Sequence, residues 1–172
     1  QEGLESLLED VSTVAMQFSE NNAIPYFSHV DAGTVDLVRS CRTEVVSSGD
    51  LIQRFEAVLS SEQQDQHREA ALALTSIVQA AFKEAATALS AQGETNEWAI
   101  QQFILDQFKE AELNTEHPPI VAVNENSAVP HYQPTEQEFA KIHPGDFLLI
   151  DLWARSTEPD SAYADITWNA YL

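Results

Sequence analysis

The sequence predicts an α+β fold in which two long helices pack on one face of an antiparallel sheet. Apolar residues recur with helical spacing along two long stretches, residues 61–90 and 97–113. The residues that follow contain apolar runs typical of strands, at 120–123, 147–154 and 163–168. Because the helices come first and the strands afterwards, the order is typical of an α+β layer rather than of alternating α/β units.

The first 59 residues follow a different pattern. Residues 4–18 have helical spacing, Asp31 is suited to cap a helix that continues through Val38, and residues 44–46 are typical of a short strand. Ser48 or Asp50 then opens another helix. This alternation is typical of an α/β domain, but it offers too few strands to complete a sheet. We therefore expect residues 1–59 to be the helical tail of an α/β domain, and residues 60–172 to form a second domain.

Capping and breaking residues set the limits of the elements in the second domain. Ser60 and Gln63 fit a capping box at the start of the first long helix, and Gly93 ends it. Thr95 is expected to cap the second helix, and Pro118 with Pro119 stops helical structure after it. The strand 120–123, a polar loop over 124–134, a helical turn within 136–142 and a hairpin of two strands should follow.

Composition limits the function classes. The chain of 172 residues has a net charge of −20, which disfavours nucleic acids and anionic membranes as partners. A single cysteine, Cys41, excludes an internal disulfide framework and favours a reducing, cytoplasmic setting. No apolar run reaches the roughly 20 residues that a membrane span needs. The chain begins with Gln1 rather than methionine, so we expect processing or an excised piece.

Two aspartates in the hairpin are the candidates for chemistry. Asp151 and Asp165 each stand among apolar and aromatic neighbours, where aspartate is uncommon. A hairpin centred on Glu158 would place them directly opposite one another, with Cβ atoms roughly 4.5–5.5 Å apart. Two carboxylates that close repel unless one is protonated or a cation lies between them, so a divalent metal ion is a candidate ligand. The alternatives are a solvated face or a hairpin in another register.

The order of several motifs resembles that of the pita-bread metallopeptidases, which include Xaa-Pro dipeptidase, aminopeptidase P and methionine aminopeptidase. The motifs are Pro119-Ile-Val-Ala-Val-Asn124, Asn126-Ser-Ala-Val-Pro-His131-Tyr132, Pro144-Gly-Asp-Phe-Leu-Leu-Ile-Asp151 and Tyr163-Ala-Asp165-Ile-Thr167. The resemblance covers about residues 60–172 and implies the first half of a pita-bread domain. Val30-Asp-Ala-Gly-Thr34 is similar to the end of the creatinase-like domain that precedes the catalytic domain in such proteins.

The resemblance implies a role for each matching residue. Asp151 corresponds to the first aspartate ligand of a dinuclear metal site, and Asp165 to the aspartate that bridges both metals. His131 corresponds to the histidine that contacts the substrate, and Thr167 is expected to support Asp165 as a hydrogen-bond partner. Two divalent ions (Mn, Co, Zn or Fe) would then provide a metal-bound hydroxide that hydrolyses the bond next to proline in a peptide or dipeptide.

Two departures from the family pattern qualify this expectation. The 14 positions between Asp151 and Asp165 are more than the usual family loop, so residues 155–162 resemble an insertion. The family completes its site with one histidine and two glutamates further along, and this chain has no residue after Leu172. We therefore expect a truncated fragment that binds metal weakly or not at all and is inactive alone.

Three functions remain open at this stage. The first is a fragment of a Xaa-Pro metallopeptidase. The second is a non-catalytic pita-bread module that binds peptides, and the third is a creatinase-like amidinohydrolase, because a fold alone does not confer an activity. We also expect self-association into a homo-oligomer, because half of a pita-bread domain would leave a sheet face or edge uncovered.

Overall fold

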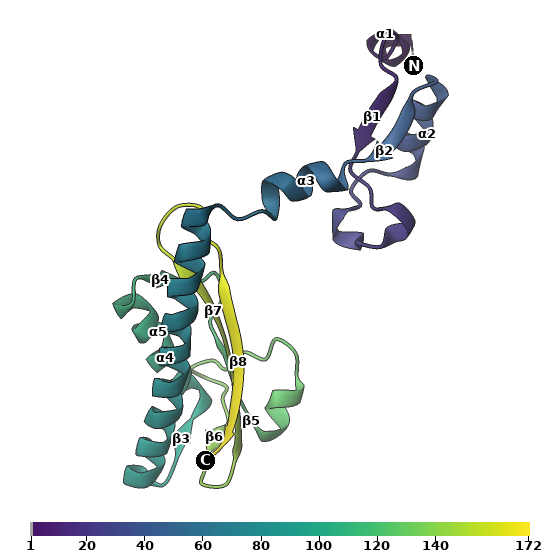
Figure 1. Cartoon of the computed structure of the whole chain (residues 1–172). Helices are drawn as coiled ribbons and strands as arrows, with labels where there is room; N and C mark the ends of the chain where they lie inside the picture. The colour runs from purple at the N-terminus through teal and green to yellow at the C-terminus, as the bar shows by residue number, and fades with distance from the viewer. Residues whose placement is uncertain (1) are drawn as a thin grey trace. The chain divides into compact units, whose positions relative to one another are not determined.

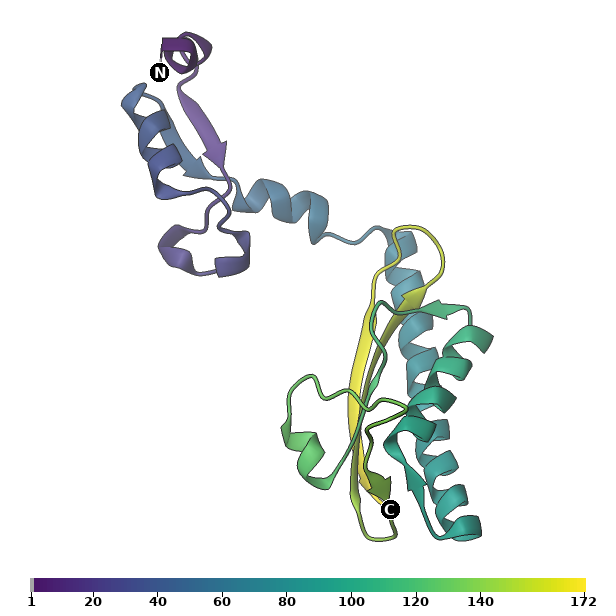
Figure 2. The ribbon, with the colours of Figure 1, turned by 180° about the vertical axis from the view of Figure 1, so that it is seen from behind.

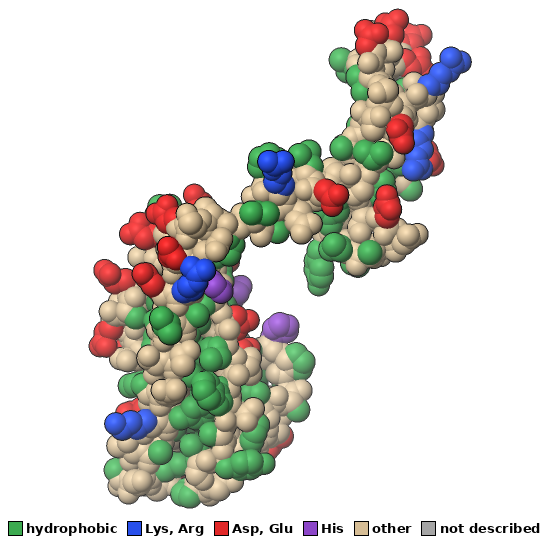
Figure 3. Space-filling model, viewed as in Figure 1, with side chains coloured by type: hydrophobic (Ala, Val, Ile, Leu, Met, Phe, Trp, Pro, Cys, Tyr) green, Lys and Arg blue, Asp and Glu red, His purple; other side chains and the backbone are tan. Residues whose placement is uncertain are grey.

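The computed structural model describes residues 2–172, which divide into two compact units at residues 58 and 59 (Figure 1). The sequence pattern predicted this division at residues 59 and 60. None of the helices in residues 2–172 has both the length and the apolar composition of a membrane span. Acidic side chains are more widespread than basic ones on the face shown in Figure 3.

The first unit contains a two-stranded parallel sheet with a helix between the strands in sequence. Strands β1 (Thr13–Met16) and β2 (Glu44–Ser47) pair in parallel, and helix α2 (Ala32–Ser40) connects them. The other elements are α1 (Glu2–Leu7), the 3-10 turns Glu20–Asn22 and Pro25–Phe27, and α3 (Gly49–Glu56). Among the described residues of this unit, Val38 is the one buried apolar side chain, so its core is small.

Two expectations for the first unit have different outcomes. Asp31 caps α2, because its Oδ1 accepts a hydrogen bond of 3.0 Å from the Thr34 amide. The helix expected over residues 4–18 is wrong: α1 ends at Leu7, and residues 13–16 form β1. The parallel pairing with β2, about thirty residues away, overrides the local helical spacing.

The second unit is an antiparallel sheet covered on one face by two helices, which confirms the predicted α+β class (Figures 1 and 2). Helix α4 (Ser61–Gln92) packs against strands β7 (Phe147–Ser156) and β8 (Ala164–Tyr171). Helix α5 (Glu97–Glu110) packs against β5 (Ile120–Val123) and against α4. Strand β7 lies between β8 and β5 and also pairs with the short strand β4 (Leu113–Asn114).

Local signals set the limits of both helices. Ser60 and Gln63 form the predicted capping box, with hydrogen bonds of 3.1 Å and 2.8 Å to each other's backbone amides. Gly93 ends α4 in the left-handed conformation, with φ of 80°. We expected Thr95 to cap α5, but the cap is Asn96, whose Oδ1 accepts a hydrogen bond of 2.8 Å from the Ala99 amide.

A second, two-stranded sheet replaces the helical turn expected within residues 136–142. Strands β3 (Thr95–Asn96) and β6 (Lys141–Ile142) pair antiparallel, so residues 141–142 are extended. Residues 135–138 form a turn closed by a hydrogen bond of 3.2 Å from the Glu138 amide to the Thr135 carbonyl. The 3-10 turn η3 (Asn124–Ala128) follows β5 and begins the long connection to β6. The core of the unit consists of apolar side chains from the helices and from one face of the sheet, including Leu74, Val78, Ile100, Ile104, Leu148, Ile150 and Leu152.

Candidate metal and peptide site

Strand β7 places Asp151 on the face of the sheet that points away from α4 and α5. Side chains alternate between the two faces of a strand. On one face Leu148, Ile150, Leu152 and Ala154 are 0% exposed and join the core beneath the helices. Leu149, Asp151 and Trp153 are half-buried and occupy the other face. Asp151 therefore lies between two core residues in the sequence, but its carboxylate is on the opposite face of the sheet from their side chains.

The two aspartates lie on one face but are not directly opposite, so the predicted register is wrong. Asp151 pairs with Thr167, and Asp165 pairs with Trp153. The two aspartates are thus diagonal neighbours, for which a separation of about 7–8 Å is typical. A register change of two residues keeps both side chains on the same face, whereas a change of one would have moved one of them to the other face.

The connection between β7 and β8 explains the difference in register. The last pair of the ladder is Ala154 with Ala164, which centres the connection on residue 159 rather than on Glu158. The connection closes through a hydrogen bond of 2.6 Å from the Ser161 hydroxyl to the Ser156 carbonyl, and Asp160 adopts a left-handed φ of 58°. These features belong to the loop, which contains no glycine. The pattern of apolar residues in the two strands does not predict them.

We expected Thr167 to support Asp165, but it supports Asp151 instead. Its hydroxyl donates a hydrogen bond of 2.5 Å to Oδ1 of Asp151, which is the consequence of their direct pairing. A hydrogen bond to one carboxylate oxygen restricts the rotation of the carboxylate and leaves the other oxygen for another ligand. The structure therefore orients Asp151 before any ligand binds.

The carboxylates affect each other electrostatically. Desolvation, and then the negative charge of Asp151, raise the pKa of Asp165 above its ordinary value. Asp165 is nevertheless an exposed residue, so nearby groups remove only part of the water from its carboxylate. A cation between the two oxygen-rich groups would relieve the repulsion, and carboxylate oxygen suits hard divalent ions. The pair therefore fits a metal ion chemically.

Asp151 and His131 line the same pocket, which has a volume of about 250 Å³. Its floor is apolar and comes from Ile120, Ala122 and Leu149 on the sheet, while Val129, Pro130 and His131 come from the connection after η3. Asn126, Ser127 and Thr167 complete the lining within the described chain. His131 itself is exposed and has a left-handed φ of 61°. The structure thus brings two sequence-predicted residues to one cavity, with Asp165 diagonally beside Asp151.

Further ligands are missing from this arrangement within residues 2–172. No group of three or more His, Cys, Asp or Glu side chains in this range is placed to hold a metal ion. Asp151 and Asp165 therefore provide at most a partial set of ligands. A larger hollow, of about 730 Å³, lies in the first unit between Phe27, Ile52 and neighbouring residues, away from the two aspartates in sequence and in a different unit.

One residue beside the site was missed by the sequence analysis. Glu97 is 0% exposed, although it is the first residue of α5 and was expected only to begin an amphipathic helix. The carboxylate accepts hydrogen bonds from the connection that contains His131. An acid in the first turn of a helix is usually explained by the helix dipole, so the sequence carried no distinct signal for this role.

The comparisons with known proteins identify a family and a fold. A model of metallopeptidase family M24 matches residues 65–172. No curated protein sequence matches the chain at a significant level. Among solved structures, prolidase from Pyrococcus furiosus is 18% identical with a TM-score of 0.58, over 98% of this chain and 47% of that protein.

Two further solved structures show the same fold. X-Pro aminopeptidase from Thermotoga maritima is 19% identical with a TM-score of 0.54, over 99% of this chain and 44% of that protein. X-prolyl aminopeptidase from Caenorhabditis elegans, described as a cytosolic enzyme with a di-nuclear active site, is 20% identical with a TM-score of 0.62, over 75% of this chain and 21% of that protein. The chain therefore spans less than half the length of each of these proteins.

Proposed function

Since the chain belongs to metallopeptidase family M24, we propose that it contributes Asp151 and Asp165 to a site for two divalent metal ions in a Xaa-Pro peptidase. The observation that supports this most directly is the diagonal pair of carboxylates beside the pocket that holds His131. The family and the structurally similar prolidases and aminopeptidases indicate proline-containing peptides as the substrate class. Manganese is our first candidate for the metal, because both ligands are oxygen donors.

Each residue of the site has a distinct task in this proposal. Asp151, held by Thr167, and Asp165 would bind the metal ions, which when bound supply Lewis-acid activation of water and of the scissile carbonyl. His131 can donate a hydrogen bond to a carbonyl oxygen of the peptide from the wall of the pocket. The apolar floor of Ile120, Ala122 and Leu149 would contact the apolar part of the peptide and displace water from it.

We propose that metal binding by these residues alone is weak. Two carboxylates leave most of the coordination sphere of a divalent ion to water. No third ligand joins them within residues 2–172. Hydrolysis at a useful rate would then require further ligands, and the chain alone would bind metal and peptide without turnover.

A titration with Mn²⁺ and with Co²⁺ tests the metal site. We expect Asp151→Asn and Asp165→Asn each to weaken binding by about 10-fold or more, since each removes one of two anionic ligands. Asp106→Asn is the matched control, because Asp106 lies on α5 and pairs with Lys109 on the surface. Equal affinities for the wild type and all three variants, measured by calorimetry, would show that the aspartates do not form the site.

The pocket beside Asp151 also favours a second candidate function, a module that binds peptides without hydrolysing them. The pocket with His131 is present, whereas the described residues lack a complete set of metal ligands. Binding of a proline-containing peptide in the presence of a chelator would support this module. Peptide binding that depends on Mn²⁺ would support the peptidase site.

We also propose that the protein self-associates through strand β8. Within the described residues β8 pairs only with β7, and Trp168 and Tyr171 on it are 44% and 80% exposed. An uncovered strand edge with aromatic side chains favours pairing with another chain. Sedimentation analysis should show a dimer at micromolar concentration that Trp168→Lys weakens. A monomer at high concentration would contradict the proposal.

A further inference from the structure

Glu97 is a buried carboxylate whose partners are all hydrogen-bond donors. Its Oε1 accepts from the Val123 amide at 2.8 Å and from Nδ2 of Asn126 at 3.0 Å. Its Oε2 accepts from the Tyr132 hydroxyl at 2.7 Å and from the Ala140 amide at 2.7 Å. Burying a carboxylate without such partners is very costly, so four donors at these distances fix the side chain in one position.

All four donors belong to one stretch of chain, and they stand on both sides of His131. Val123 and Asn126 precede His131, whereas Tyr132 and Ala140 follow it. The backbone adds a further contact, since the Glu97 amide donates to the Ala140 carbonyl at 3.2 Å. One side chain at the start of α5 therefore closes the connection between β5 and β6 from both ends.

Besides Glu97, Gln101 also anchors this connection, since its Nε2 donates to Oε1 of Gln133 at 3.3 Å, and Gln133 donates to the Pro118 carbonyl at 3.2 Å. Closer to His131 the connection has few hydrogen bonds. Its internal backbone hydrogen bonds near His131 are those from the Val129 amide to Asn126 and from the Tyr132 amide to Val129, at 3.1 Å and 3.2 Å. His131 has a left-handed φ of 61°, which a residue with a side chain adopts at an energetic cost. This conformation persists only where neighbouring contacts enforce it, and the adjacent Tyr132 is held by Glu97.

Tyr132 connects Glu97 to His131, because its hydroxyl binds Glu97 and it is the next residue after His131. Desolvation, and then its hydrogen bond to Glu97, raise the pKa of the Tyr132 hydroxyl above its ordinary value. The phenol therefore remains a donor to Glu97 across the physiological range. Since Tyr132 directly follows His131, fixing the phenol limits where the imidazole can lie in the pocket.

We propose that Glu97 is a positioning residue, which holds the connection from Val123 to Ala140 so that His131 faces the pocket beside Asp151. Glu97 itself is 0% exposed and does not line the pocket, so it would act on the peptide only through the connection. The role of His131 toward the peptide rests on the proposed function, whereas the ordering of the connection by Glu97 does not.

Hydrogen exchange of the whole chain tests the proposal directly, with Glu97→Gln as the variant. The amide group turns one acceptor atom into a donor that faces donors, so about half of the hydrogen bonds are lost. We expect exchange in residues 124–140 to accelerate about 10-fold or more, with amides of α4 and β7 unchanged. The affinity for a proline-containing peptide should fall in step, while Mn²⁺ affinity stays unchanged.

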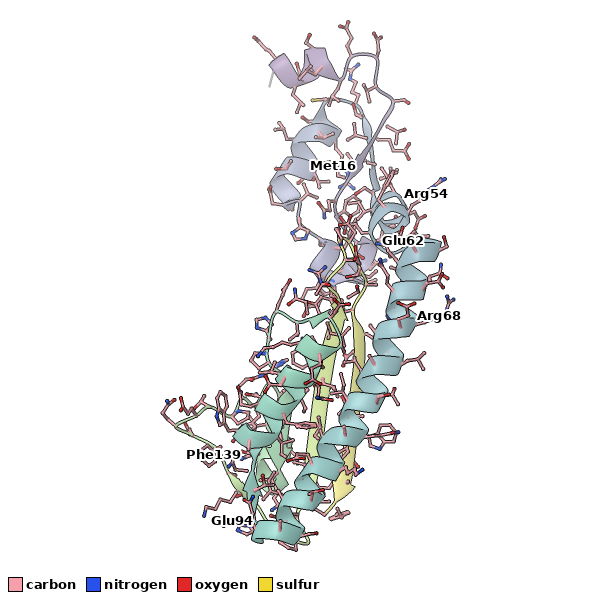
Figure 4. All side chains as sticks on the ribbon, turned by 90° about the vertical axis from the view of Figure 1, so that its left-hand side faces the viewer. Met16, Arg54, Glu62, Arg68, Glu94 and Phe139 are labelled. Carbon is pink, nitrogen blue, oxygen red and sulfur yellow. The ribbon has the colours of Figure 1, made fainter. Side chains whose placement is uncertain are left out.

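Glu94→Gln is the matched control, because Glu94 is an exposed acid that follows α4 and pairs with Lys141 on the surface. Figure 4 shows Glu94 near the end of α4 and Phe139 on the stretch that leads from His131 into β6. This variant should leave exchange in residues 124–140 as in the wild type. Tyr132→Phe removes a single donor and keeps the ring, so it should give a smaller acceleration in the same residues even if Glu97→Gln does not fold.

Several outcomes would overturn the proposal. If Tyr132→Phe and Glu97→Gln exchange like Glu94→Gln in residues 124–140, Glu97 does not order the connection. If exchange accelerates equally throughout the second unit, Glu97 has a general role in stability and no specific one. Selective acceleration in a protein that binds no peptide would support positioning by Glu97 and count against the proposed function, so the two failures remain distinguishable.

Discussion

The two faces of strand β7 differ sharply, although the same ten residues form both. Toward the helices, Leu148, Ile150, Leu152 and Ala154 are sealed from solvent. Toward the other side, Leu149, Asp151 and Trp153 remain half-buried, and Asp151 lines the pocket with His131. The alternation of a strand thus allows one face to stabilise the fold while the other carries polar groups that a core would not tolerate.

This comparison has an energetic consequence. Burying a leucine or isoleucine side chain stabilises a protein by about 1.5–3 kcal/mol. On the other face, in contrast, desolvation and then repulsion from the charge of Asp151 raise the pKa of Asp165 above its ordinary value. The first face should therefore determine stability and the second should determine binding, and substitutions can separate the two.

Leu152→Ala should give the largest effect, on the core face. It removes a side chain with 0% exposure, and such truncations cost about 2–5 kcal/mol of unfolding free energy. Leu72→Ala is the control, because Leu72 on α4 is 72% exposed and should cost less than about 0.5 kcal/mol. Similar midpoints for both variants in urea denaturation would mean that the core does not lie on this face.

Thr167→Val should have an intermediate effect, on the binding face. It removes the hydroxyl that holds Asp151 but keeps the branched shape that suits a strand. We expect a loss of at most about 1 kcal/mol in stability and a fall of about 10-fold in Mn²⁺ affinity. Thr167→Ser retains the hydroxyl and should bind as the wild type does; if it binds as weakly as the valine variant, the hydrogen bond is not the cause.

Asp165→Asn should have the smallest effect on stability, and it should raise stability where the two preceding variants lower it. The pKa of Asp165 is raised above its ordinary value of 3.8, so the folded state binds this proton more readily than the unfolded chain does. Above the folded-state pKa the charged carboxylate therefore lowers stability, and below pH 3.8 this cost is absent.

The expected result is a slightly higher melting temperature for Asp165→Asn at pH 7, with a gain that disappears as the pH falls below 3.8. The gain is small because Asp165 is exposed and solvent screens its charge. Thermal unfolding at both pH values, with Asp106→Asn as control, measures it. A variant that is less stable than the wild type at pH 7 would contradict the assigned direction.

Much of the second unit was predictable because its signals are local. The capping box of Ser60 and Gln63, the left-handed Gly93 and the strand 120–123 each depend on neighbouring residues. Period-two alternation along β7 and β8 likewise predicted that Asp151 and Asp165 lie on one face of the hairpin. The α+β class followed from the order of these elements.

The errors fall where a distant partner decides the conformation. Residues 13–16 form a strand because β2 pairs with them, and residues 141–142 form one because β3 does. Thr167 supports Asp151 because the connection between β7 and β8 sets a register that neither strand encodes. Glu97 accepts hydrogen bonds from four residues between positions 123 and 140. No pattern in the sequence relates these four residues to Glu97.

The sequence by itself determined which residues form the helices and the hairpin of the second unit, and that Asp151 and Asp165 share one face. Helical and strand periodicity are properties of neighbouring residues, and a shift of two positions does not change the face. Only the tertiary structure decided that the aspartates are diagonal neighbours and that His131 and Asp151 line one pocket. It also brought Glu97 beneath the connection that carries His131. These arrangements depend on loop geometry and on contacts between distant residues, which the order of amino acids does not display.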